Sequence, residues 1–197
     1  MSTSTVETGY GGRIRVTVAR NDRDITSEVR TFLCNKENAN KIIGLDTERS
    51  VVGGDSEYPP ESKLVILELS DGQNCLIIPL PYVQGNKLPV SLTNFLNLPD
   101  FTFTGVGINK ALKMLKSECG LTCKNAVDIG PSSWASLSKI RGEIKLHFSH
   151  WVSFWKPTSP IYEDWDNDSL TEDQINLAAA NAYLAFKVGN LIREAMY

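Results

Sequence analysis

The sequence predicts an α/β domain with a mixed central β-sheet flanked by α-helices. Residues 42–46 form an apolar run that ends at Asp46, which is typical of a buried strand. Two further β-rich runs, 63–69 and 74–79, are separated by the turn dipeptide Asp71-Gly72, which favours antiparallel pairing of at least two strands. A long helix follows the capping box Ser169-Leu170-Thr171-Glu172 and runs nearly to the last residue.

The composition is that of one globular domain. The chain has 197 residues, 42% hydrophobic and 22% charged, which is enough to build a core of its own. A net charge of −3 argues against the broad basic surface that nucleic-acid-binding proteins usually carry. Since no segment resembles a signal peptide or a membrane span, we expect a protein of the nucleus or cytoplasm that does not bind membranes.

The cysteines do not indicate a metal site. Cys119 and Cys123 have a C-x-x-x-C spacing, and the other two are Cys34 and Cys75. Because no second cysteine pair and no nearby histidine pair completes a zinc ligand set, we expect reduced structural thiols.

The first part of the chain contains one strand and one helix before the buried run. Residues 1–11 are rich in Ser, Thr and Gly, and we expect a flexible N-terminus before a single domain at 12–197. Residues 13–19 alternate polar and apolar side chains, which predicts a half-exposed strand. A short helix is predicted over 26–34, with Thr26 or Ser27 as its cap.

The second part alternates helices and strands. Gly and Pro residues mark an exposed loop within 53–60. We expect helices at 89–98 and 110–120, the second ending at a glycine, and strands at 101–106 and 126–129. This order of elements is similar to an RNase H-like layout.

Short motifs in this order resemble one nuclease family. They are Gly44-Leu45-Asp46-Thr47-Glu48, Leu64-Val65-Ile66-Leu67-Glu68-Leu69, Gly105-Val106-Gly107-Ile108, Val127-Asp128-Ile129, and Asp164-Trp165 followed by Leu170-Thr171-Glu172-Asp173-Gln174-Ile175 and Ala178-Ala179. Together they resemble Werner-syndrome-type, RNase D-like 3′–5′ exonuclease domains of the DEDDy class, with the plant Werner-like branch most similar. The resemblance covers roughly residues 12–197.

The resemblance implies two-metal phosphodiester hydrolysis, which needs several carboxylates around a pair of Mg²⁺ or Mn²⁺ ions. In the family, four acidic residues hold the metals, and a tyrosine four residues before the last acid orients the attacking water. Asp46 and Glu48 match the first two acids, and their i, i+2 spacing on a strand places them on the same side. We expect them to be a residual, weak metal site.

The remaining positions of the family pattern lack the required chemistry. The third acid corresponds to Ala111, and the Tyr-x-x-x-Asp of the last motif corresponds to Leu177 and Asn181. Asn181 offers a neutral carbonyl in place of a charge, and Leu177 cannot hydrogen-bond a water. The loss of one essential member of a catalytic unit typically costs orders of magnitude in rate.

Two functions follow from this comparison. The first is a catalytically inactive, exonuclease-like module that requires no cofactor, binds Mg²⁺ or Mn²⁺ weakly at most, and acts through a protein partner, self-association or nucleic acid. The second is an active Mg²⁺- or Mn²⁺-dependent 3′–5′ exonuclease on DNA or RNA with a relocated ligand. Candidates for that ligand are Asn109, Asp128, Asp164 and Asp166.

Other features leave more than one interpretation open. His147 and His150 form an H-x-x-H pair without an evident third metal ligand. The aromatic and basic residues Trp151, Trp155 and Lys156 are candidates for contact with nucleic acid or a partner, although such aromatics also occur in cores. The alanines of the last helix allow close packing, either inside the domain or between copies.

Overall fold

The computed structural model describes residues 2–7, 13–52, 61–80, 88–131, 142–144, 165 and 169–196. The strands are β1 (Ser2–Glu7), β2 (Arg13–Val18), β3 (Ile42–Val52), β4 (Glu61–Ser70), β5 (Asn74–Pro79), β6 (Thr102–Gly105) and β7 (Ala126–Asp128). The labelled helices are α1 (Asp22–Cys34), α2 (Val90–Leu96), α3 (Ile108–Cys119) and α5 (Glu172–Met196).

The strands form one mixed sheet in the order β1-β2-β5-β4-β3-β6-β7. Strand β4 is antiparallel to both of its neighbours, β3 and β5. The pairs β2–β5, β3–β6 and β6–β7 are parallel. The predicted mixed α/β architecture is therefore confirmed, as is the antiparallel pair joined by the Asp71-Gly72 turn.

Strand β1 lies at one edge of the sheet and differs from the flexible segment expected over 1–11. Ser2–Glu7 pairs antiparallel with β2 along its whole length. Val6 is buried, and the Glu7 carboxylate accepts a hydrogen bond of 2.8 Å from Arg13. The polar composition misled the prediction because an edge strand with one buried side chain needs little apolar sequence.

Two helices begin at caps other than those predicted. Helix α1 starts about one turn before Thr26, because the Asn21 side chain accepts a hydrogen bond from the backbone N–H of Asp24. The capping box of α5 joins Thr171 and Gln174, which bond each other's backbone N–H at 2.9 and 3.2 Å. The predicted box, Ser169 with Glu172, is shifted by two residues from the observed one.

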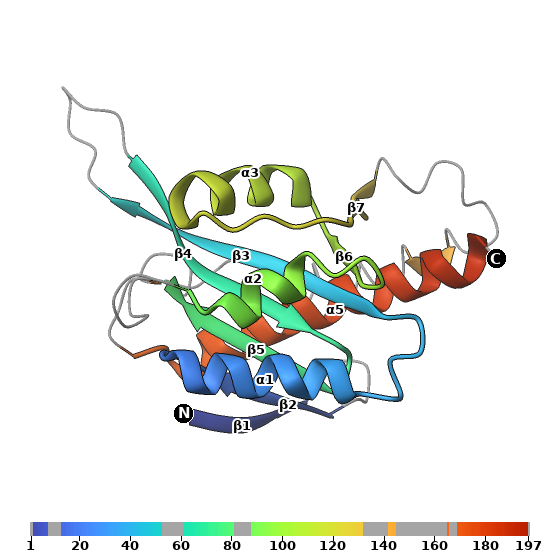
Figure 1. Cartoon of the computed structure of the whole chain (residues 1–197), viewed down its shortest axis with the longest axis horizontal. Coiled ribbons are helices and arrows are strands. Elements are labelled where there is room, and N and C mark those ends of the chain that lie inside the picture. The colour runs from blue at the N-terminus through green and yellow to red at the C-terminus, as the bar shows by residue number, and fades with distance from the viewer. Residues whose placement is uncertain are drawn as a thin grey trace.

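The helices cover the two faces of the sheet unequally, as Figure 1 shows. Helices α1, α2 and α3 lie on one face, where Phe32, Phe95 and Phe103 belong to the larger core cluster. The long helix α5 crosses the opposite face, where Leu177 and Trp165 pack with Ile66 of β4. Two hydrophobic layers therefore hold the sheet between them.

Helix α5 approaches the sheet so closely that backbone meets backbone. A Cβ atom added to Gly44 of β3 would lie 2.5 Å from the backbone nitrogen of Phe186 and would overlap the carbonyl of Ala182. Four of the alanines of α5 are buried at this face: Ala178, Ala179, Ala182 and Ala185. These small side chains serve packing inside the domain.

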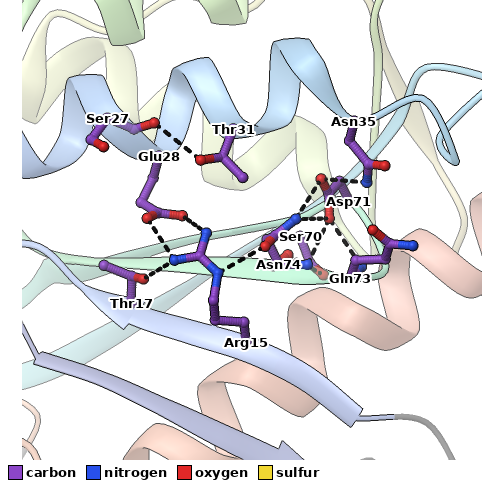
Figure 2. Close-up of polar contacts among 10 residues, drawn as sticks. All are labelled: Arg15, Thr17, Ser27, Glu28, Thr31, Asn35, Ser70, Asp71, Gln73 and Asn74. Atoms are coloured by element: carbon purple, nitrogen blue, oxygen red, sulfur yellow. Dashed lines mark hydrogen bonds and ion pairs between the residues drawn. The ribbon is translucent and has the colours of Figure 1, made fainter.

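A polar network ties the first helix to the sheet on the other face (Figure 2). Arg15 of β2 donates to both carboxylate oxygens of Glu28 on α1, at 3.0 and 2.7 Å, and to Asn74 of β5 at 3.0 Å. Asp71, in the turn before β5, accepts from the backbone N–H of Asn74 and from the Asn35 side chain. A partly buried ion pair thus joins β2 to α1, and the bond to Asn74 connects both to β5.

Two findings concern the cysteines and membrane spans. All four cysteines are free thiols, as the spacing indicated. Among the described residues, no helix combines the length and the apolar character needed to cross a membrane.

Candidate functional site

Asp46 and Glu48 lie on β3 and face helix α5. In the antiparallel pairing with β4, Asp46 lies opposite Glu68 and Glu48 lies opposite Ile66, which belongs to the α5-side core. The side-chain amide of Asn181 on α5 donates a hydrogen bond of 2.9 Å to Oε1 of Glu48. The structure therefore brings together Asp46, Glu48 and Asn181, as the exonuclease pattern implies.

Glu68 is a third carboxyl group in this site, and the sequence analysis did not identify it. Directly opposed residues of an antiparallel pair have Cβ atoms about 5 Å apart on the same face, so the Glu68 side chain is a close neighbour of Asp46. Glu68 has no exposed surface, and within the described residues neither of its carboxyl oxygens has a hydrogen-bond partner. The sequence signal that could have indicated Glu68 is its position as the single charged residue in the otherwise apolar run 64–69.

Burial raises the pKa of all three carboxyl groups, and the charges of neighbouring carboxylates add to the shift at Glu48 and Glu68. Burial raises the pKa of Asp46 to about 6, although its hydrogen bond from the Thr47 N–H opposes the shift. Burial, followed by the charge of Asp46, raises the pKa of Glu48 to about 8, against the opposing effect of the Asn181 bond. The pKa of Glu68 is raised well above its usual value by burial and then by Glu48 and Asp46. The folded domain therefore holds protons here at neutral pH.

We expect these shifts to make the domain less stable as the pH rises from 4 to 8. Over this window the unfolded chain loses protons that Asp46 and Glu48 retain in the folded state, with folded pKa values of about 6 and 8. Since one unit corresponds to about 1.4 kcal/mol for each group, the fall should be on the order of 5 kcal/mol. Urea denaturation at pH 5 and pH 8 measures it.

The Glu68→Gln variant is the control for this pH dependence. It removes one of the groups whose pKa is raised, so the fall in stability between pH 5 and pH 8 should become smaller. An equally steep fall in the variant would show that the dependence arises elsewhere in the chain.

The positions that depart from the exonuclease pattern have other environments. Ala111 lies in the first turn of α3, half-buried, and its methyl group has no ligand atom. Leu177 is 2% exposed and packs in the α5-side core. Asn181 faces Glu48 with its N–H group, which is a donor where a metal ligand must be an acceptor.

The described candidates for a relocated ligand lie elsewhere. Asn109 is exposed on α3, where it lines a shallow surface pocket with Lys113. Asp128 lies on β7, which β6 separates from β3. Its side chain accepts hydrogen bonds from the backbone N–H groups of Gly107 and Gly130. Outside the described residues lie Asp164, Asp166, His147, His150, Trp151, Trp155 and Lys156.

The described residues do not fit a two-metal centre. Within the described ranges, no group of three or more His, Cys, Asp or Glu side chains is arranged to hold a metal ion. Glu68 adds a carboxyl group but is fully buried, and Asn181 presents a donor to Glu48. Hard cations need several converging oxygen ligands, which these side chains do not supply.

The fold is that of solved exonuclease domains. The Aedes aegypti Nibbler EXO domain matches with a TM-score of 0.65 and 10% identity, covering 98% of this chain and 92% of that one. Escherichia coli RNase D, an exoribonuclease involved in structured RNA processing, matches with a TM-score of 0.62 and 21% identity, covering 92% of this chain and 45% of that one.

The sequence comparisons are negative. No protein-family model and no curated protein matches the chain. At 10% and 21% identity, the two structural matches define the architecture alone. The chain has the mixed α/β, RNase H-like fold of 3′–5′ exonuclease domains.

Proposed function

We propose that this domain is an exonuclease-like module that has lost catalysis and acts by binding. One observation carries the proposal: Asn181 donates its amide N–H to Glu48, at the position where the exonuclease pattern requires an acidic metal ligand. Asp46 and Glu48 then remain without the charged partners that two-metal hydrolysis needs. The module requires no cofactor, and it binds Mg²⁺ or Mn²⁺ weakly at most.

The presence of leucine at position 177 supports the same conclusion independently. In the exonuclease pattern this position carries the tyrosine that orients water. Here the side chain packs against Ile66, Val65 and their neighbours in an apolar cluster. Because the leucine contributes to the core, the position serves folding, and the attacking water has no partner there.

We further propose that the domain derives from the Werner-type branch, as its motifs indicate, and acts in the nucleus or cytoplasm. Its partner is a protein, including a second copy of the chain, or a nucleic acid. Light scattering tests self-association. Salt-dependent binding to single-stranded DNA or RNA tests the nucleic-acid partner, because phosphate contacts weaken steeply with salt.

We expect the purified domain not to degrade labelled single-stranded or recessed-end DNA or RNA in Mg²⁺ or Mn²⁺. The expected rate is indistinguishable from that of Asp46→Ala, since loss of several members of one catalytic unit costs orders of magnitude. Gel analysis of 3′-end shortening is the measurement. Stepwise shortening that Asp46→Ala abolishes would refute the proposal.

The alternative of an active 3′–5′ exonuclease with a relocated ligand has one observation in its favour. Glu68 lies opposite Asp46 and brings a third carboxyl group to the site. If Glu68 replaced the missing acid, Glu68→Gln would abolish shortening as completely as Asp46→Ala does. Inactivity of both the wild type and the Glu68→Gln variant excludes this alternative.

A further inference from the structure

We propose that Asn181 takes the place of a metal ion as the link between α5 and β3. The folded domain then needs no divalent cation, and the single change Asn181→Asp makes its stability depend on Mn²⁺. This inference rests on the proposed loss of catalysis, but its readout is stability, which is measured separately from nuclease activity.

The first step is the direction of the hydrogen bond. Asn181 is 9% exposed, and its Nδ2 lies 2.9 Å from Oε1 of Glu48. A side-chain amide can donate to a carboxyl oxygen without any intervening ion, whether the carboxyl group is protonated or ionised. An aspartate has no donor when ionised, so at position 181 it would present oxygen to oxygen.

The second step is that α5 is held against the sheet near residue 181, so a move away from β3 would cost packing contacts and a hydrogen bond. The backbone at Gly44 meets the backbone at Ala182, the residue after Asn181. Further along α5, a Cβ on Gly189 would lie 2.5 Å from the hydroxyl of Thr104, and that hydroxyl donates to the carbonyl of Ala185 at 2.9 Å. Packing at these points fixes the spacing between residues 181 and 48.

The third step is the number of carboxyl groups already present. Asp46, Glu48 and Glu68 lie on one face of two paired strands, and Glu68 is fully buried. A fourth carboxylate would add repulsion that only protons or a cation can neutralise. In the Asn181→Asp variant, the new carboxylate would bring its oxygen atoms to those of Asp46 and Glu48, and oxygen is the donor atom that Mn²⁺ and Mg²⁺ prefer.

Thermal unfolding at pH 7.5 in EDTA and in millimolar Mn²⁺ tests the inference. The wild type should have the same Tm in both conditions. Asn181→Asp should lower the Tm in EDTA by about 5 °C or more and regain most of it in Mn²⁺. The matched control is Asn190→Asp on the same helix, whose Oδ1 accepts from Asn40 and which should show no response to Mn²⁺.

Two results would overturn the inference. One is Mn²⁺ binding by the wild type, seen either as a higher Tm in Mn²⁺ or as a tight Mn²⁺ site by electron paramagnetic resonance. This measurement does not depend on the folding of any variant. The other is an Asn181→Asp variant that Mn²⁺ does not stabilise. An Asn181→Asp variant that unfolds in EDTA but folds in Mn²⁺ supports the inference.

The outcomes also separate this inference from the proposed function. A wild type that degrades DNA or RNA yet shows no Mn²⁺ effect on Tm refutes the loss of catalysis and leaves the link at Asn181 standing. A wild type that is inactive yet stabilised by Mn²⁺ refutes the link and leaves the loss of catalysis standing.

Discussion

Replacing Gly44 with alanine is expected to destabilise the domain by about 3 kcal/mol or more, at the upper end of what overpacking costs. The added methyl group would overlap the carbonyl of Ala182 and lie 2.5 Å from the nitrogen of Phe186. Both are backbone atoms in the middle of α5, so no side-chain rotation can relieve the clash. The whole helix would have to shift on the sheet.

Urea denaturation followed by circular dichroism measures this loss. The matched control is Gly142→Ala, because a Cβ at Gly142 meets no atom within 4 Å and the residue is exposed. The control should stay within about 0.5 kcal/mol of the wild type. Equal stabilities for the two variants would show that the close approach of α5 to β3 does not exist in solution.

Replacing Arg15 with alanine is expected to cost about 2–3 kcal/mol, less than for a fully buried ion pair, because the Arg15 side chain is 37% exposed. The Glu28 side chain is 2% exposed, so its carboxylate would remain buried without its bidentate partner. The change also removes the Arg15 bond to Asn74, which links β2 to β5 (Figure 2).

The adjacent ion pair provides the control for Arg15. Arg13 lies on the same strand and bonds Glu7 at 2.8 Å, but both side chains are 74% exposed. Exposed pairs contribute little, so Arg13→Ala should cost less than about 1 kcal/mol. A double variant, Arg15→Met with Glu28→Leu, should recover much of the loss, because it leaves no buried charge. If Arg15→Ala costs no more than Arg13→Ala, the network is not stabilising.

Most of the fold could be predicted because its elements follow local physical rules. The apolar side chains of the run ending at Asp46 favour burial, and Asp71-Gly72 favours a turn between β4 and β5. The edge strand β1 could not be predicted in this way. Its sequence is polar, and its position depends on pairing with β2, which local sequence does not encode.

The candidate site could be predicted only in part. Asp46 and Glu48 share a strand, so their spacing alone placed them on one face. Glu68 belongs to another strand, so its position opposite Asp46 depends on the pairing register of β3 and β4. That register shifts at a bulge between Glu48 and Arg49, which local sequence does not reveal. Sequence also gives the identity of Asn181 but not the direction of its hydrogen bond.

The packing of α5 against β3 has a consequence for folding during synthesis. The apolar face that carries Val16, Ile66 and Ile77 is covered by a helix formed from Glu172–Met196, near the end of the sequence. Until the ribosome has released that segment, the sheet can form its strand pairs but presents this face to water. Such exposed surface attracts chaperones and promotes aggregation, so this face of the sheet is protected only after α5 has been synthesised.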